Sequence, residues 1–314
     1  MIRRVTGVWL WAFVLSACLS PNPIFSESVV NKEVNVVFYN LKNYLAMERR
    51  VGKEVVKDAP KPENEVRHLI DGIVAIQPDI LGVCELGDAS YMADFKGRLK
   101  KAGLDLPHTE LVTAASGHNR NLALLSRYPI IKVNSRDDYT YTIGDTKLPF
   151  QRGVLDVTIA INPRYHLRYV ALHLKSKRDV PEADQALMRL NEARLARQHL
   201  DQIFEKEPGI NLVVMGDFND LRIEPPVKAL QGNWSRPGYL SSLTLDDHYG
   251  FRWTYHWSYA DSYSRFDYAL YSRGLSPEIN RPDSHIYHWD DWDKASDHRP
   301  LVMKIMPEDQ QESK

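Results

Sequence analysis

Short apolar runs recur along this chain, and several of them end in polar side chains. The clearest run, residues 212–215, reads Leu-Val-Val-Met and is typical of a strand that is buried on both faces. Gly216 follows, where we expect the backbone to turn, and then come Asp217, Asn219 and Asp220. Polar groups at the end of a buried strand stand on a rigid support, as a binding or catalytic site requires.

The same β-type pattern predicts seven further strand segments, and helical spacing predicts two helices. We expect strands within residues 34–40, 79–85, 121–133, 152–161, 167–174, 210–218, 266–272 and 301–306, and helices within 62–78 and 182–206. Strands outnumber helices and do not alternate strictly with them, which argues against a doubly wound fold. The pattern favours two packed β-sheets flanked by helices.

Three segments are less regular. Residues 222–262 have no clear period and predict a long functional loop. The aromatic residues Trp253, Tyr255, Trp257 and Tyr259 alternate within that segment, which favours a hairpin with one face in the core; stacking on nucleobases is the alternative. A third segment is rich in basic residues and is typical of a solvated loop, with a phosphate groove as the alternative. Its basic residues are Arg49, Arg50, Lys53, Lys57 and Lys61.

The N-terminal segment has the pattern of an export signal, with Arg3 and Arg4 before a short apolar core and small residues. Residues 15–18, Leu-Ser-Ala-Cys, resemble a bacterial lipobox, which would make Cys18 a lipidated first residue in contact with a membrane. Plain secretion is the alternative. We expect a signal peptide at 1–18, a linker at 19–32, one domain at 33–306 and a polar tail at 307–314. The expected location is the periplasm or the outer membrane of the cell envelope, or the exterior.

Composition and charge limit the kinds of partner. With 43% hydrophobic and 26% charged residues, the chain is typical of a soluble globular protein. Its 40 basic and 41 acidic residues give a net charge of −1, so any phosphate-bearing partner must be held locally and not by a broad basic surface. Cys84 follows Cys18 as the second and last cysteine, which excludes a disulfide framework; we expect it to be a small buried hydrophobe.

Chemically useful side chains recur where predicted strands meet loops. Asn40, Glu85 and His173 end three apolar runs, and Asp297 and His298 precede the last one. Each residue alone also has an ordinary structural role, as a helix cap, a turn residue or a core histidine. Their repetition at strand ends favours a shared site.

Six motifs that contain these residues occur in a recognisable order: YNLKN, CELGD, LHLKS, GDFND, SRFDYALYS and SDHRP. The chain thereby resembles the endonuclease/exonuclease/phosphatase superfamily of deoxyribonuclease-like, metal-dependent phosphoesterases. The resemblance covers residues 33–306. It implies an α/β (α+β) fold, a four-layer sandwich of two mainly antiparallel β-sheets flanked by helices.

The resemblance also implies a metal site. Glu85 resembles the main metal carboxylate, with Asn40 and Asp297 close to the same ion. Mg²⁺ suits few protein carboxylates and open positions for water and phosphate, and Mn²⁺ or Ca²⁺ are alternatives. Where some nucleases carry a carboxylate near the first motif, this chain has Lys42 and Asn43, so a second metal is not implied.

Catalytic roles follow from the same resemblance. His298 resembles the catalytic imidazole and Asp267 the carboxylate that orients it. Asp217 and Asn219 resemble the pair that positions the attacking water and binds phosphate. His173 resembles a second histidine that binds phosphate or protonates the leaving oxygen. Arg152, in the sequence QRGVL, is a candidate phosphate clamp.

These roles predict a metal-dependent phosphodiester hydrolase. We expect a monomeric, exported or envelope-anchored nuclease whose partner is nucleic acid. A lipid, nucleotide or sugar phosphoester is the alternative substrate, and a noncatalytic surface binding protein is the alternative from another class. The two histidines, His173 and His298, favour the deoxyribonuclease and phosphodiesterase branches over abasic-site repair.

Overall fold

The computed structural model describes residues 33–115 and 117–308. The predicted signal peptide, Cys18, the linker and most of the predicted polar tail lie outside these residues. None of the helices in the described residues is both long enough and apolar enough to cross a membrane.

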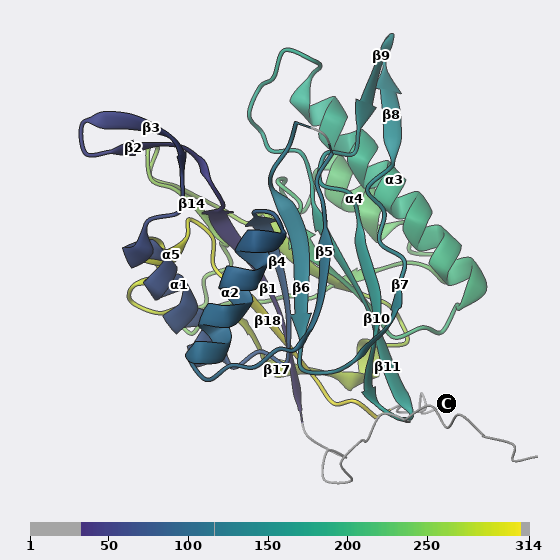
Figure 1. Cartoon of the computed structure of the whole chain (residues 1–314). Helices are drawn as coiled ribbons and strands as arrows, with labels where there is room; N and C mark the ends of the chain where they lie inside the picture. The colour runs from purple at the N-terminus through teal and green to yellow at the C-terminus, as the bar shows by residue number, and fades with distance from the viewer. Residues whose placement is uncertain (1–32, 116, 309–314) are drawn as a thin grey trace, which may run out of the picture.

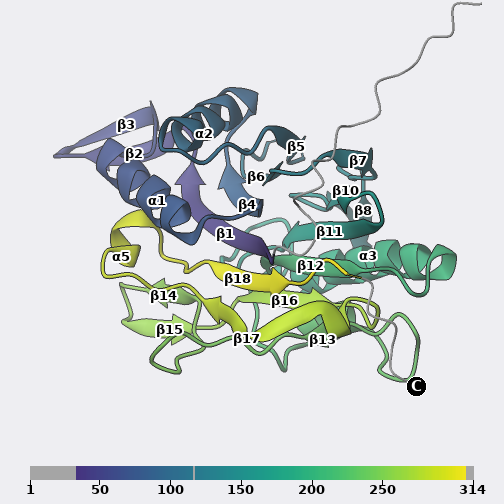
Figure 2. The same ribbon diagram turned by 90° about the horizontal axis from the view of Figure 1, so that it is seen from below.

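Two six-stranded β-sheets face each other and form the middle of the molecule (Figures 1 and 2). The first sheet has the order β17-β18-β1-β4-β6-β5, with bounds β1 (Val34–Tyr44), β4 (Ile80–Leu86), β5 (His108–Val112), β6 (Asn121–Ser126), β17 (Ile279–Ile286) and β18 (Leu301–Ile305). The second has the order β13-β16-β12-β11-β10-β7, with bounds β7 (Ile130–Val133), β10 (Leu155–Asn162), β11 (Tyr165–His173), β12 (Leu212–Asp217), β13 (Ser241–Ser242) and β16 (Asp267–Tyr271).

Helices cover the outer face of each sheet, so the molecule has four layers (Figure 2). The first sheet carries α1 (Glu63–Ile76), α2 (Ala89–Lys101) and α5 (Trp292–Ala295), and the second carries α3 (Gln185–Lys206) and α4 (Pro225–Gln231). Three two-stranded hairpins complete the fold: β2 (Met47–Val51) with β3 (Glu54–Ala59), β8 (Thr140–Ile143) with β9 (Thr146–Pro149), and β14 (Tyr255–Trp257) with β15 (Ser262–Ser264). A short 3₁₀ helix spans Ser276–Glu278.

Alternation along the strands explains the layers. On β1, Val36 and Phe38 belong to the core between the sheets, whereas Val37 and Tyr39 belong to the core under α1 and α2. Successive side chains of a strand point to opposite faces, so a strand that is apolar at every position can fill two cores at once. The predicted four-layer sandwich is therefore confirmed.

Parallel pairing gathers the ends of four strands at one edge of the sandwich. β1 pairs in parallel with β4, and β11 pairs in parallel with β12, while the other pairs in both sheets are antiparallel. In a parallel pair both strands finish at the same edge. The polar residues that end these four strands are thereby brought to the same end of the molecule.

Several element predictions need correction. Residues 121–133 form two strands in different sheets, β6 and β7, because the chain crosses between the sheets around Pro129. The predicted loop at 222–262 contains α4, β13 and β14. The basic segment forms the β2–β3 hairpin, and Lys61, which lies after the hairpin, is buried. The helix α2 was not predicted; Asp88 caps it by accepting the backbone N–H groups of Ser90 and Tyr91.

We expected the backbone to turn at Gly216, and this prediction is wrong. It lies inside β12, where a Cβ atom would stand 2.1 Å from the carbonyl oxygen of Leu172 on β11. The turn falls instead at Asn219, whose φ of 52° lies in the left-handed region that asparagine tolerates. Gly216 is therefore required for close approach of two backbones.

We predict that Gly216→Ala destabilises the fold by about 2–3 kcal/mol, because the added methyl group collides with backbone that cannot move away. Gly97→Ala is the matched control, since Gly97 lies in α2 with no atom near its missing side chain. Alanine there should be neutral or stabilise by up to about 1 kcal/mol. Chemical denaturation of both variants measures this difference, and equal effects at the two positions would contradict the explanation.

Candidate active site

Five of the predicted site residues come from neighbouring strands of the two sheets. In the second sheet, His173 on β11 pairs with Asp217 on β12, and Asp217 pairs with Asp267 on β16. In the first sheet, Asn40 on β1 lies beside β4, which carries Glu85. The register of the strands alone therefore sets the spacing of these side chains.

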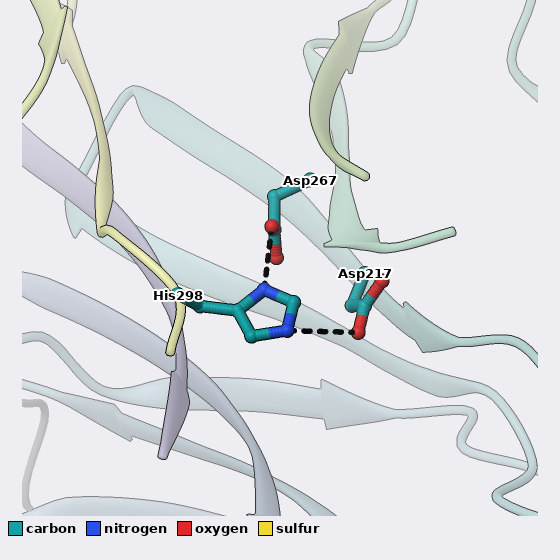
Figure 3. A group of neighbouring side chains, drawn as sticks. All are labelled: Asp217, Asp267 and His298. Carbon is teal, nitrogen blue, oxygen red and sulfur yellow. Dashed lines mark hydrogen bonds and ion pairs between the residues drawn. The ribbon is translucent and has the colours of Figure 1, made fainter. Parts of the chain in front are cut away.

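His298 lies between two aspartates (Figure 3). Its Nδ1 is 2.8 Å from Oδ2 of Asp267, and its Nε2 is 3.7 Å from Oδ2 of Asp217. All three side chains are buried. The second carboxylate oxygen of Asp267, Oδ1, is buried without a hydrogen-bond partner in the described residues, so His298 is the polar group that this carboxylate engages.

The two carboxylates control the charge of His298. Burial opposes the imidazolium, but the negative charges of Asp267 and Asp217 outweigh that cost and raise the pKa of His298 to about 10. The folded-state pKa lies above the usual value of 6.5. The protonated ring therefore stabilises the folded protein, and this stabilisation is fully present below pH 6.5. This stabilisation is lost as the pH rises through about 10. At neutral pH His298 is therefore a hydrogen-bond donor at both ring nitrogens.

Asp217 is held by donors on both of its oxygens. The backbone N–H of Asn219 donates to Oδ1 at 2.9 Å, and Nδ2 of Asn40 donates to Oδ2 at 3.1 Å. Burial nevertheless raises the pKa of Asp217, and His298 opposes that rise. A carboxylate with a raised pKa is a stronger base than an ordinary one, which suits proton abstraction.

His173 differs from His298 in charge. Burial lowers the pKa of His173 well below its usual range, and the positive charges of Arg152, His298 and Arg120 lower it further. Its Nε2 lies 3.7 Å from Oδ2 of Asp217, and its buried Nδ1 has no hydrogen-bond partner among the described residues. His173 is thus a neutral imidazole at neutral pH, beside a charged one.

Glu85 has the geometry of a carboxylate prepared for a cation. One oxygen, Oε2, accepts the backbone N–H of Asn43 at 2.8 Å, while Oε1 faces His173 at 3.9 Å and its side chain is 17% exposed. Its φ of 61° is unusual for a residue with a side chain, and the pairing of β4 with β6 shifts register at this point. One fixed and one open oxygen fit a hard divalent ion.

Asn40 and Asp297, the other two predicted metal ligands, have different surroundings. Asn40 accepts the backbone N–H of Lys42 at Oδ1 and donates at Nδ2 into the site. Asp297 is half-buried, and its charge contributes, after burial, to a raised pKa of the neighbouring Tyr39. Their roles as metal ligands stay predictions.

The Asp217–Asp267–His298 group also brings three ligand-type atoms within 4.8 Å of one another. A cation there would compete with the proton of His298, because an imidazolium cannot bind a metal. The hydrogen bond between His298 and Asp267 argues for a proton-holding group instead. Glu85 is therefore the better metal candidate.

Asn219 and Arg152 occupy less direct positions. The side-chain Nδ2 of Asn219 donates to the carbonyl oxygen of Leu174 at 3.0 Å, so it also supports the end of β11. Arg152 is buried; its Nη1 donates to Oε1 of Gln151 at 2.8 Å, and its Nε has no partner among the described residues. A buried guanidinium with a free donor fits an incoming phosphate oxygen.

The supporting contacts of three residues escaped the sequence analysis. Ser296 donates to the carbonyl oxygen of Asn40 and accepts the backbone N–H of His298, which fixes the loop before β18. Thr254 accepts the backbone N–H of Asp267. Asn43 holds Glu85, as described above. Ser296 stands inside the SDHRP motif and could have been found there; the contacts of Thr254 and Asn43 depend on tertiary structure.

Comparison with known proteins agrees with this geometry. The chain matches the sequence model of the Endonuclease/Exonuclease/phosphatase family over residues 50–298, well over half of its length, and it belongs to that family. Enzymes of this family hydrolyse phosphoester bonds and depend on divalent metal ions. A comparison with curated proteins found no match.

Solved structures share the fold at low sequence identity. The human Nocturnin catalytic domain with bound sulfate is 19% identical, with a TM-score of 0.60 over 87% of this chain and 96% of that one. Sphingomyelinase C from Streptomyces griseocarneus is 16% identical, with a TM-score of 0.57 over 87% and 99%. Truncated TDP2 from Caenorhabditis elegans is 14% identical, with a TM-score of 0.58 over 87% and 98%.

We predict that Asp267 and His298 act as one catalytic unit. His298→Ala should lower turnover by about 10²–10⁴-fold, the usual contribution of an acid–base group, and Asp267→Ala by less. The double variant should be scarcely slower than His298→Ala, because a carboxylate that orients an imidazole has no value without it. Turnover of all three variants, measured per folded molecule, tests this.

A control and an opposing outcome complete that experiment. His68 and Asp291 also lie close together, at 3.5 Å, and are half-buried, but they stand outside the Asp217–Asp267–His298 group, so His68→Ala should leave turnover unchanged. If the losses of the two single variants at Asp267 and His298 simply multiply, the residues do not act together and Asp267 has a structural role.

Proposed function

We propose that the protein is a metal-dependent phosphodiesterase that cleaves nucleic acid. The observation that carries this proposal is an aromatic hairpin, β14–β15, joined directly to the catalytic histidine. Tyr255 forms a backbone bridge with His298, and the two rings lie 4.9 Å apart. A base-bearing substrate would therefore find aromatic rings beside the group that contacts its phosphate.

The outer end of the hairpin is exposed and aromatic. Trp257 and Tyr259 stack with ring centroids 5.9 Å apart, and they are 51% and 90% exposed. Trp253 packs against the guanidinium of Arg299. A hairpin is present as expected, but the expected packing of its aromatic face into the core is wrong for Trp257 and Tyr259, which are exposed. Stacking of a base on an exposed aromatic ring contributes about 1–3 kcal/mol of binding free energy per base and does not depend on the base sequence.

Asp217 is the proposed general base. It would take the proton of the attacking water while Asn219 and Asn40 hold its oxygens in place. A divalent cation held by Glu85, with Asn40 and Asp297, would supply positive charge to a phosphate oxygen when bound. Mg²⁺ is the proposed ion because the donors are few and are all oxygens.

The two histidines would have different tasks. His298, charged and oriented by Asp267, would donate to an oxygen of the phosphate as negative charge builds up there. As the oxygen of water bonds to phosphorus and the P–O bond to the leaving oxygen breaks, His298 would pass its proton to the leaving oxygen. His173 is neutral and can donate one hydrogen bond from Nε2 without adding a charge. Arg152 would donate from its free Nε. This combination of a base, a charged donor and a neutral donor argues against a noncatalytic binding protein.

A lipid phosphodiester is the second candidate substrate. The β2–β3 hairpin exposes Val51 and Val55, and β14–β15 exposes Trp257 and Tyr259. Both hairpins lie on the same side of the molecule, at the left of Figures 1 and 2. Exposed apolar side chains on two projecting hairpins favour contact with a lipid surface.

We predict that Glu85→Gln lowers hydrolysis of plasmid DNA and RNA by about 10²-fold or more, with the fold intact, because the amide keeps the shape but removes the charge that holds the cation. Glu205→Gln, an exposed change on α3, is the matched control and should be fully active. Rates are measured with and without Mg²⁺, on both nucleic acids and on sphingomyelin vesicles.

The substrates separate the alternatives. Cleavage of nucleic acid that requires Mg²⁺ and Glu85 supports the proposal. Cleavage of sphingomyelin alone would replace it with the lipid candidate. Full activity of Glu85→Gln, or of protein stripped with chelator, would refute the proposed site.

A further inference from the structure

Three arginines near Glu85 hydrogen-bond only to neutral acceptors among the described residues. Arg49 donates to the carbonyl oxygens of Asn43, Leu45 and Ala59. Arg120 donates from Nε to Oδ1 of Asn43 at 2.8 Å, and Arg152 donates to Gln151, as noted above. Within the described chain, none of these three guanidinium groups forms a salt bridge.

Most other buried or half-buried arginines of the described residues form a salt bridge with a carboxylate. Those that pair with an aspartate or a glutamate are Arg98, Arg168, Arg189, Arg197 and Arg299. Arg265 is the remaining exception, and it lies over the ring of Tyr268. Removing a charge from water without a counter-charge is costly, so proteins usually pair such groups. An unpaired cluster beside an active site therefore calls for an anion from outside.

The cluster is attached to the candidate metal carboxylate. Asn43 accepts hydrogen bonds from both Arg49 and Arg120, and its backbone N–H donates to Glu85 at 2.8 Å. Arg152 and Arg120 both lie close enough to His173 to lower its pKa, after burial has done so. Arg120 and Arg152 thus lie on the side of the site that holds His173, and Arg49 and Arg120 are joined to Glu85 through Asn43.

Nearby carboxylates do not use up the hydrogen-bonding capacity of the three arginines. Glu65 and Glu192 act on Arg49 and Arg152 electrostatically, but neither forms a salt bridge with them in the described residues, and a cation bound at Glu85 would use the charge of that carboxylate. A phosphodiester group would already be met by His298 and the cation. The arginine donors that lack a charged partner therefore fit a second anionic group close to the first.

We infer that Arg49, Arg120 and Arg152 form a second phosphate subsite, so that the preferred substrate carries another phosphate beside the one that is cleaved. This inference rests on the proposed function. Guanidinium groups match the geometry of phosphate oxygens, and a strand of nucleic acid supplies phosphates at regular intervals. A choline lipid carries one phosphate and a cationic headgroup, which this cluster would repel.

Dinucleotides test the subsite through catalysis. The substrates are TpT, pTpT and TpTp, which share one cleavable phosphodiester and differ in a terminal phosphate. The wild-type protein should cleave pTpT or TpTp with a kcat/KM about tenfold or more above that for TpT, and whichever is preferred gives the direction of the strand. Arg49→Gln and Arg120→Gln should each reduce that ratio strongly.

Arg50→Gln is the matched control. Arg50 is the exposed neighbour of Arg49 on β2, so the same charge is removed from the same hairpin and the ratio should be kept. Arg120→Lys keeps the charge and should retain part of the preference. Thermal unfolding of each variant shows whether a loss comes from unfolding. A wild-type ratio near one, or a ratio preserved in both Gln variants, would overturn the subsite.

Binding separates this inference from the proposed function. Thymidine 3′,5′-bisphosphate and thymidine 5′-monophosphate are titrated calorimetrically in the presence of chelator, where no turnover occurs. Tighter binding of the bisphosphate by wild-type protein, lost in the Arg49→Gln Arg120→Gln double variant, supports the subsite even if no dinucleotide is cleaved and the nuclease proposal fails. Equal affinities for the two nucleotides in the wild-type protein would refute the subsite.

Discussion

The hydrogen bond between His298 and Asp267 joins the two sheets at the point where the chemistry is expected. His298 precedes β18 of the first sheet, and Asp267 begins β16 of the second. Because both groups are buried, the bond must compensate for taking two charges out of water. It can do so only if the sheets keep their spacing. The geometry of the site and the packing of the sandwich therefore depend on each other.

The remaining polar groups of the site follow from that pair. With a charged His298 beside it, Asp217 has a favourable neighbour for its own charge although burial raises its pKa. The positive charge of His298 also helps to keep His173 neutral. One protonated ring thus separates the roles of two histidines and a carboxylate. Glu85 stands outside the group formed by Asp217, Asp267 and His298, and its side chain is partly exposed, so a cation can reach it.

Much of the fold was predictable because it depends on alternation within single strands. The apolar pattern of β1 and β12 already implies burial on both faces, and four layers follow from it. The gathering of Asn40, Glu85, His173 and Asp217 was also accessible, since each ends an apolar run. Features that depend on the neighbouring strand could not be predicted. The local sequence around Gly216 indicates a turn, but the role of this glycine is set by the backbone of Leu172 on the neighbouring strand.

The arginine cluster shows the same limit for function. In the sequence, Arg49 and Arg120 are separated by 70 positions, and Arg49 is one of several basic residues in a polar segment. Only the folded chain shows that both donate to Asn43, and that Arg50 does not share this position. Local sequence predicts where a charged residue lies along the chain, but its missing counter-charge is a property of tertiary structure.

The protonation state of His298 is the central claim. It can be measured by NMR titration of ¹⁵N-histidine-labelled, metal-free protein, with the His298 signals assigned by their loss in His298→Gln. The structure predicts a ring that is protonated at pH 8 and titrates near pH 10. A ring that loses its proton at or below the ordinary value of 6.5 would contradict the account, because the two carboxylates would then not control the charge of the site.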